Sequence, residues 1–128
     1  RKVNFEALLR KSDFISLHTP LTSETLNMIS GSQFKKMKTS AILINTARGA
    51  IVNVKALLRA LTHNEIGVAA LDVYDEEPLS KNSPLSQYAK HHTNLILTPH
   101  IAASTKEAVE EASLYAANAV IDFFHPKL

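Results

Sequence analysis

Ala41-Ile42-Leu43-Ile44 is the stretch that decides the fold class, because it is apolar at four consecutive positions. Such a run is typical of a parallel β-strand that is covered on both faces. The polar segment Asn45-Thr46-Ala47-Arg48-Gly49 follows at once, so we expect the strand to end there. Outward from it lie three more short apolar runs that we interpret as strands, at residues 14–17, 66–73 and 95–97.

Helical patterns alternate with these runs. Residues 4–11 have apolar side chains at helical spacing, Ser30-Gly31-Ser32-Gln33 has the form of a capping box, and Asn53 can cap a leucine-striped helix. Ser104-Thr105-Lys106-Glu107 is a second capping box, which opens a helix of about 20 residues that Pro126 ends. Strands that alternate with helices imply a parallel sheet with flanking helices, which is the α/β class.

The segment between Val73 and Leu95 departs from this alternation. Pro78, Asn82 and Pro84 fill it with turn-forming residues, so we expect a loop there. A long loop inside a compact domain often has a function.

Composition argues against several classes of protein. The 128 residues suffice for one domain with a real core, and the 14 basic and 12 acidic residues are scattered, which gives little support for nucleic-acid binding. No apolar run approaches the roughly 18 residues needed to cross a bilayer, and no signal-peptide pattern opens the chain. The chain has no cysteine for disulfides or thiolate chemistry, and a cytoplasmic location is the default expectation.

Polar side chains follow each of the four apolar runs. Ligands of open parallel sheets bind beyond the carboxyl ends of the strands. Those ends are followed by residues 18–22, 45–49, 72–77 and 98–103. An arginine, a glutamate and a histidine, namely Arg48, Glu77 and His100, are thereby delivered to one edge of the sheet, where they can bind a carboxylate and move a proton. We expect the three to converge on a single pocket.

Each candidate also has a purely structural interpretation. Arg48 can hold a substrate carboxylate bidentately and polarise its neighbouring carbonyl, or it can be a surface arginine at a strand exit. Glu77 can favour the charged form of a neighbouring histidine, or it can be solvated. His100 and His18 both lie at strand ends, where a histidine can exchange the proton that accompanies hydride transfer. Asp72 needs a partner because an unpaired buried carboxylate is costly, and that partner is either a cofactor amide or a backbone N–H.

The other histidines are expected on the solvated surface, namely His63, His91, His92 and His125. No pair of them has convincing metal-ligand spacing and no thiolate is available, so we reject a zinc site.

Taken together, these segments resemble the D-isomer-specific 2-hydroxyacid dehydrogenase family, which includes phosphoglycerate dehydrogenase and glyoxylate or hydroxypyruvate reductase. The resemblance is carried by four motifs in the family's order and spacing, at residues 13–22, 44–52, 69–78 and 94–105. It implies an oxidoreductase that transfers a hydride between NAD(H) and a D-2-hydroxy acid or 2-oxo acid, with 3-phosphoglycerate as a narrower candidate. It also implies that the chain is the second half of a Rossmann-like parallel sheet of about four strands, flanked by helices and followed by a long C-terminal helix.

The resemblance implies roles for individual residues. Arg48 binds and orients the 2-oxo acid, His100 is the acid/base catalyst at the substrate oxygen, and Glu77 is its partner. NAD contacts are implied at His18, Thr19, Pro20, Thr46, Ala47, Arg48, Asp72, His100, Ala102 and Ala103. Many relatives have two glycines where this chain has Ala102 and Ala103, which is a mild departure from the family pattern.

A larger departure is the missing phosphate-binding motif. Family members have a G-x-G-x-x-G turn and a downstream acidic residue, whereas Gly31, Gly49 and Gly67 are the only glycines here and none forms that motif. We therefore interpret residues 1–128 as a partial NAD(P)-binding domain that lacks the Gly-rich half and the substrate domain. We expect no useful turnover from the chain alone, and the choice between NAD and NADP stays open because the ribose-recognising segment is absent.

Two rival hypotheses come from other classes. The same family architecture occurs in non-catalytic, NAD-sensing corepressors that interact with protein partners. Alternatively, the chain is a self-associating scaffold whose unpaired sheet edge pairs with another copy. We expect a homo-oligomer, with a dimer as the simplest case, because the Val, Ala and Phe stripe of the last helix is either exposed or covered by another copy.

Overall fold

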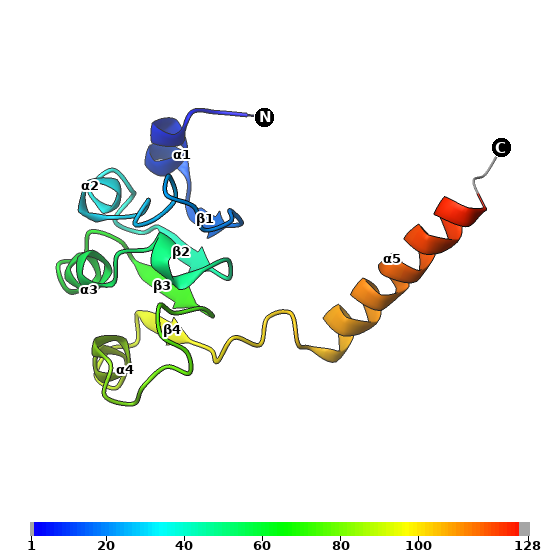
Figure 1. Ribbon diagram of the computed structural model, residues 1–128. Coiled ribbons are helices and arrows are strands. Elements are labelled where there is room, and N and C mark those ends of the chain that lie inside the picture. Colours follow the sequence, from blue (N-terminus) through cyan, green and yellow to red (C-terminus); the bar gives the residue numbers. More distant parts are fainter. Residues whose placement is uncertain (1, 126–128) are drawn as a thin grey trace.

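The computed structural model describes residues 2–125, and these form one sheet of four parallel strands in the order β1-β2-β3-β4 (Figure 1). The elements are α1 (Phe5–Lys11), β1 (Phe14–Leu17), α2 (Gly31–Phe34), β2 (Ile42–Asn45), the 3₁₀ turn η1 (Gly49–Ile51), α3 (Val54–Thr62), β3 (Val68–Leu71), α4 (Pro84–Ala89), β4 (Leu95–Leu97) and α5 (Lys106–Phe124). The register aligns Leu17 with Asn45, Asn45 with Leu71, and Leu71 with Leu97, so the strands end at one edge. The predicted α/β class, with a parallel sheet and a long C-terminal helix, is confirmed.

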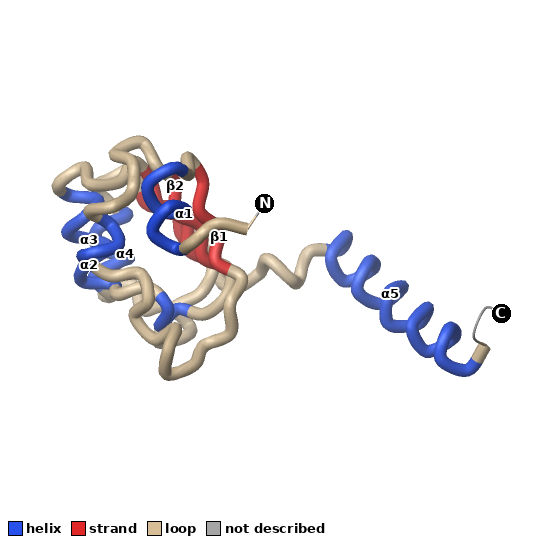
Figure 2. The backbone as a smooth tube through the Cα atoms, turned by 90° about the horizontal axis from the view of Figure 1, so that it is seen from above, coloured by secondary structure: helices blue, strands red, loops and turns tan. Residues whose placement is uncertain are grey.

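Helices cover only one face of the sheet within residues 2–125. Both views place α2, α3 and α4 on the same side of the strands (Figures 1 and 2), and Leu43 on that side is 1% exposed. On the opposite face Phe14 is 68% exposed and Ile96 is 53% exposed. Ile42 and Ile44 also point to that face and are only partly buried. The prediction that β2 is covered on both faces is therefore wrong for the described part of the chain.

Helix caps explain where the helices begin. The Asn4 side chain accepts from the Ala7 N–H at the start of α1, and Asn53 Oδ1 accepts from the Ala56 N–H at the start of α3, as the sequence predicts. In α2, Gln33 Oε1 accepts from the Ser30 N–H at 3.2 Å, which is the Gln half of the predicted capping box.

Three predicted features differ from the structure. α5 is capped by Thr105 rather than by Ser104, because the Thr105 side chain accepts from the Ala108 N–H. The strand predicted at residues 66–73 is shorter, since β3 spans only Val68–Leu71. The segment predicted as loop contains α4, whose N-cap is Ser83 and whose first residue is Pro84, and proline is favoured at that helical position. Pro126 lies outside the described residues.

The last helix lies away from the sheet. α5 follows an irregular segment with turns after β4 and projects from the rest of the chain (Figure 1), and none of its described side chains is buried. No helix within residues 2–125 combines the length and the apolar character that a membrane crossing requires.

Candidate active site

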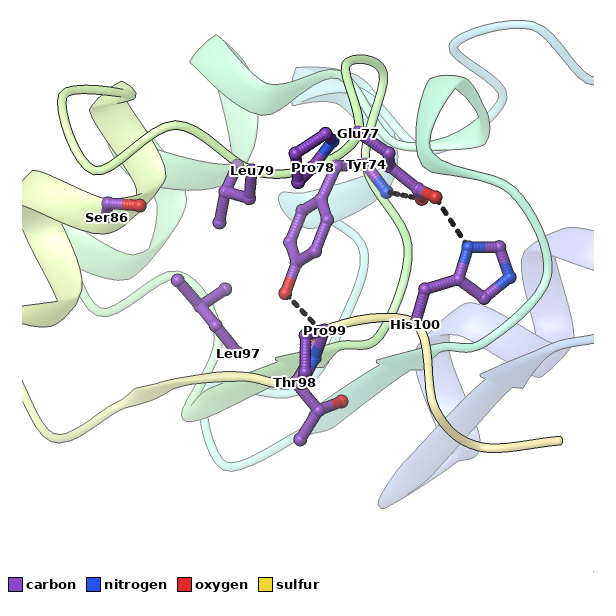
Figure 3. Close-up of a pocket in the computed structure, with 9 residues that line it drawn as sticks. All are labelled: Tyr74, Glu77, Pro78, Leu79, Ser86, Leu97, Thr98, Pro99 and His100. Carbon is purple, nitrogen blue, oxygen red and sulfur yellow. Dashed lines mark hydrogen bonds and ion pairs between the residues drawn. The ribbon is translucent and has the colours of Figure 1, made fainter. Parts of the chain in front are cut away.

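Glu77 and His100 form a direct pair at the edge where the strands end. Glu77 lies six residues beyond the end of β3 at Leu71, and His100 lies three residues beyond the end of β4 at Leu97. His100 Nδ1 is 2.5 Å from Glu77 Oε2, and the Tyr74 N–H donates to the other carboxylate oxygen at 2.9 Å (Figure 3). The His100 side chain is 50% exposed, so its second ring nitrogen can be reached from solvent. The structure therefore brings together the two residues that were expected to be partners.

The charge of Glu77 determines the direction of this hydrogen bond. The bond with His100 lowers the pKa of the Glu77 carboxyl most, and the bond from the Tyr74 N–H lowers it further. An ionised carboxylate can only accept, so at neutral pH Nδ1 must carry the proton. In neutral His100 the free electron pair is then on Nε2, the nitrogen that faces away from Glu77.

Asp72 contacts residues on both sides of His100, through a side-chain hydroxyl before it and through two backbone N–H groups after it. Asp72 is buried, with 5% of the residue exposed. Its carboxylate accepts from Thr98 Oγ1 at 2.5 Å and from the N–H groups of Ile101 and Ala102, both at 3.0 Å. Burial alone raises the pKa of Asp72, but these hydrogen bonds outweigh it, so that its pKa lies below the ordinary value. Two backbone N–H groups and one threonine hydroxyl are thus the partners seen here, and a contact with a cofactor amide stays a prediction.

Arg48 lies at the same edge but lines a different pocket. A pocket of about 590 Å³ contains Glu77 and His100, whereas Arg48 lines a second one of about 500 Å³ beside β1 and β2. The expectation of a single pocket for all three is therefore wrong for the described chain. Arg48 is exposed, and its Nη1 donates to the Ala47 carbonyl at 2.6 Å. Thr46 is also exposed and lines this second pocket together with Ala47.

The remaining cofactor candidates at the exit of β1 line this second pocket too. His18 is exposed and its Nε2 is 2.8 Å from Ser16 Oγ, with no carboxylate within the described residues as a partner. His100 thus has a carboxylate partner, whereas the partner of His18 is a serine hydroxyl. Pro20 is exposed, and among the described residues the hydroxyl of Thr19 is buried without a hydrogen bond. A buried hydroxyl without a partner needs one, and a ligand in this pocket can provide it.

Beyond His100, Ala102 and Ala103 are both exposed, and Ala102 is held through its N–H by Asp72. The four histidines expected on the surface are all exposed, namely His63, His91, His92 and His125.

Two residues that shape the site were not singled out from the sequence. Asn45 is 1% exposed, accepts from the Ala47 N–H at 3.0 Å and donates to the Arg48 carbonyl at 2.9 Å, so it fixes the turn that presents Arg48. An asparagine directly before a turn is the signal that could have identified it. Tyr74 contacts both Glu77 and the β4 exit, and no local pattern indicates this.

Comparisons with known proteins identify this arrangement. The sequence profile of the D-isomer specific 2-hydroxyacid dehydrogenase NAD binding domain matches residues 1–102. The chain is 45% identical over 125 residues to a glyoxylate reductase of Aeropyrum pernix, covering 98% of this chain and 36% of that protein. It is 42% identical over 120 residues to a D-3-phosphoglycerate dehydrogenase of Archaeoglobus fulgidus, covering 94% of this chain and 22% of that one.

A solved structure gives the same result. The NAD-complexed D-isomer specific 2-hydroxyacid dehydrogenase of Lactobacillus delbrueckii ssp. bulgaricus superposes with a TM-score of 0.76 at 31% identity, over 98% of this chain and 41% of that one. The chain thus spans well under half the length of each of these relatives. By sequence and by fold, this chain belongs to the D-isomer specific 2-hydroxyacid dehydrogenase family, within its NAD binding domain.

Proposed function

We propose that this chain is the catalytic-residue-bearing part of an NAD-dependent D-2-hydroxyacid dehydrogenase. The reaction is reversible hydride transfer between NAD(H) and a D-2-hydroxy acid or its 2-oxo acid, with 3-phosphoglycerate as one candidate substrate. The observation that carries the proposal is the direct contact between Glu77 and His100 at the carboxyl edge of a parallel sheet.

His100 is the proton donor and acceptor in this proposal. Reduction of a 2-oxo acid needs a proton at the substrate oxygen, and oxidation of the hydroxy acid removes it. His100 Nε2 is free for this exchange because Nδ1 is bonded to Glu77, whose lowered pKa keeps the carboxylate charged at neutral pH. The carboxylate holds the imidazole in one orientation, with Nε2 directed away from Glu77.

Arg48 is the substrate-carboxylate ligand. Its guanidinium is exposed at the exit of β2, one strand removed from β3 and two from β4, and it can form two parallel hydrogen bonds to a carboxylate. Neighbouring strands are about 4.8 Å apart. A 2-oxo acid held by Arg48 can therefore extend toward His100 along the sheet edge.

The residues present fit a dinucleotide in part. NAD supplies the hydride-transferring nicotinamide when it is bound, and the pocket lined by His18, Thr19, Pro20, Thr46 and Ala47 is the proposed contact surface on this chain. The unpaired buried hydroxyl of Thr19 supports a ligand there. Asp72, Ala102 and Ala103 are the proposed contacts near His100.

A Gly-rich phosphate loop is missing from the 128 residues, and the chain covers 36% of the glyoxylate reductase noted above. We propose that residues 1–128 are part of an NAD(P)-binding domain whose Gly-rich half and substrate domain belong to the complete reading frame. Residues 1–128 alone then bind NADH weakly and have no useful turnover. Reduction of glyoxylate with NADH by the purified 128-residue chain contradicts this part of the proposal.

His100→Gln in the protein from the complete reading frame tests the catalytic role. General acid–base catalysis typically contributes a factor of about 10²–10⁴, so kcat with glyoxylate, hydroxypyruvate or 3-phosphohydroxypyruvate and NADH is expected to fall at least about 100-fold. His92→Gln is the matched control, because His92 is exposed and stacks on Tyr88, outside the site. Equal rates for the two variants contradict the assignment.

Arg48→Gln separates the enzyme from the NAD-sensing corepressor. A dehydrogenase loses turnover because the 2-oxo acid is no longer held, and the loss is greater in kcat/KM than in NADH affinity. A protein that keeps its biological role with this substitution is a binder and not an enzyme.

The exposed last helix suggests that the chain also has a protein partner, namely a second copy of itself. We propose that a second copy of the chain packs α5 on the uncovered face of the sheet. The chain exposes 8980 Å², whereas a compact monomer of 14.1 kDa is expected to expose about 6,700 Å². The excess is about 2,200 Å² per chain, or about 4,400 Å² over two chains, which is in the range of obligate homodimer interfaces. Cytoplasmic location and the absence of nucleic-acid binding stay predictions.

Light scattering during size-exclusion chromatography of the 128-residue chain tests the dimer. Phe14→Glu places a charge on the uncovered face and is expected to give a monomer. Leu26→Glu is the control, since Leu26 is 53% exposed in the loop between β1 and α2. A monomeric wild-type chain contradicts the dimer.

A further inference from the structure

Tyr74 bridges the exits of β3 and β4 beneath the catalytic pair. The residue is 9% exposed, and its ring lines the pocket that contains Glu77 and His100 (Figure 3). Its hydroxyl donates to the Thr98 carbonyl at 2.7 Å and lies 3.1 Å from the Leu71 carbonyl. Burial raises the pKa of Tyr74, and the nearby Asp72 charge raises it further, so the phenol keeps its proton for donation.

The same residue also holds Glu77. The Tyr74 N–H donates to Glu77 Oε1 at 2.9 Å, and Glu77 Oε2 contacts His100 Nδ1. The His100 N–H donates to the Thr98 carbonyl at 3.1 Å, which is the acceptor that the Tyr74 hydroxyl uses. The hydrogen bonds therefore form a closed ring that starts and ends at Tyr74.

His100 needs such support because its backbone is strained. Its φ angle is 55°, in the left-handed region that residues other than glycine seldom occupy. Strained residues persist when several surrounding contacts fix them. Asp72 holds the chain after His100 through Ile101 and Ala102 and also accepts from the Thr98 hydroxyl, while the Tyr74 hydroxyl holds the Thr98 backbone through its carbonyl.

We propose that Tyr74 is a positioning residue, whose hydroxyl and backbone N–H together set the contact between Glu77 and the His100 ring. The hydroxyl fixes the Thr98–Pro99–His100 turn, and the N–H fixes the carboxylate that the ring meets. Its effect on turnover rests on the function proposed above, but its effect on the His100 ring does not.

Tyr74→Phe tests the proposal because it removes the hydroxyl and keeps the ring in the pocket. Tyr88→Phe is the matched control, since the Tyr88 hydroxyl donates to Asn94 Oδ1 at 3.2 Å, away from the pair. In the 128-residue chain, ¹⁵N spectra of the His100 ring are expected to show neutral His100 with its proton on Nδ1 in the wild type and in Tyr88→Phe. Tyr74→Phe is expected to show both tautomers in comparable amounts.

In the protein from the complete reading frame, Tyr74→Phe is expected to lower kcat about 10-fold with KM nearly unchanged. If the His100 ring has the same tautomer in Tyr74→Phe as in the wild type, the positioning proposal is overturned. This result does not depend on turnover, so it is distinct from failure of the proposed function, which would appear as a wild-type protein without turnover. If the Tyr74→Phe variant does not fold, a measurement on the wild-type chain tests the proposal instead. A slowly exchanging Tyr74 hydroxyl proton with a nuclear Overhauser contact to the His100 N–H supports the proposal, and its absence overturns it.

Discussion

Gly49→Ala is expected to destabilise the chain more than the same change at either other glycine. The three atoms nearest to a β-carbon built on Gly49 are all backbone atoms, namely the Tyr74 carbonyl carbon at 2.0 Å, its oxygen at 2.4 Å and the Asp75 nitrogen at 2.5 Å. An ordinary van der Waals contact begins at 3.4 Å, so either the Gly49 segment or the Tyr74–Asp75 segment must move by about 1.4 Å. No flexible side chain is available to absorb this movement.

The cost follows from which atoms must move. Both segments are held by neighbours, since Asn45 bonds to the turn before Gly49 and the Tyr74 N–H bonds to Glu77. Overpacking a well-packed site costs about 1–3 kcal/mol, and we expect the upper end of this range because backbone meets backbone. For a domain of this size, about 3 kcal/mol lowers Tm by about 10 °C.

Two control substitutions make the prediction a graded series. A β-carbon on Gly67 lies 3.0 Å from the Ser40 oxygen, so Gly67→Ala requires a shift of only a few tenths of an ångström and should cost about 1 kcal/mol. A β-carbon on Gly31 lies 3.5 Å from Nη2 of Arg59, so Gly31→Ala should be neutral or slightly stabilising. The three midpoints of urea unfolding, followed by circular dichroism, give the order. A Gly49→Ala midpoint equal to that of Gly31→Ala refutes the reasoning.

Three other predictions concern charge and helix caps. The pKa of Asp72 lies below its ordinary value of 3.8, so the stability that this carboxylate confers is present above that pH and is lost as the pH falls through the folded-state pKa. Urea unfolding should therefore show a larger deficit for Asp72→Asn at about pH 7 than at about pH 2.5, and equal deficits would contradict this. His100→Ala removes the largest cause of the lowered Glu77 pKa, which should rise toward 4.5 in a ¹³C titration of the carboxyl. Asn53→Ala should cost about 1 kcal/mol in thermal unfolding, because α3 packs on the core, whereas Thr105→Ala should only speed amide exchange in α5, which buries no described side chain.

The strands could be predicted because burial leaves a direct mark on the sequence. Strands with apolar neighbours are themselves apolar, and the runs at Phe14–Leu17 and Leu95–Leu97 coincide with β1 and β4. The prediction that both faces of β2 are covered was wrong, because the sequence does not say where the covering layer comes from. Ile42 and Ile44 show that a second apolar layer is needed, but an apolar side chain does not indicate which chain supplies that layer.

The pairing of Glu77 with His100 was implied by the family resemblance, and the parallel register that brings the ends of β3 and β4 together agrees with it. The sequence correctly placed Arg48 at the edge where the strands end. Which pocket it lines depends on how side chains pack between the strands, and the spacing of residues along the sequence does not encode this packing. Tyr74 was missed because the bond from its hydroxyl to the Thr98 carbonyl spans 24 residues of sequence. A tyrosine after a buried strand gives no local sign of such a contact.

The contact of Gly49 with Tyr74 links the two pockets at this edge. Arg48 precedes Gly49 directly, and Tyr74 bonds to Glu77 and to the Thr98 carbonyl two residues before His100. A side chain at position 49 would push the β2 exit away from the β3 exit, and the guanidinium would move away from the imidazole with it. Glycine after the arginine is therefore required by packing and, in the function proposed above, also sets the distance between a carboxylate bound to Arg48 and the imidazole of His100.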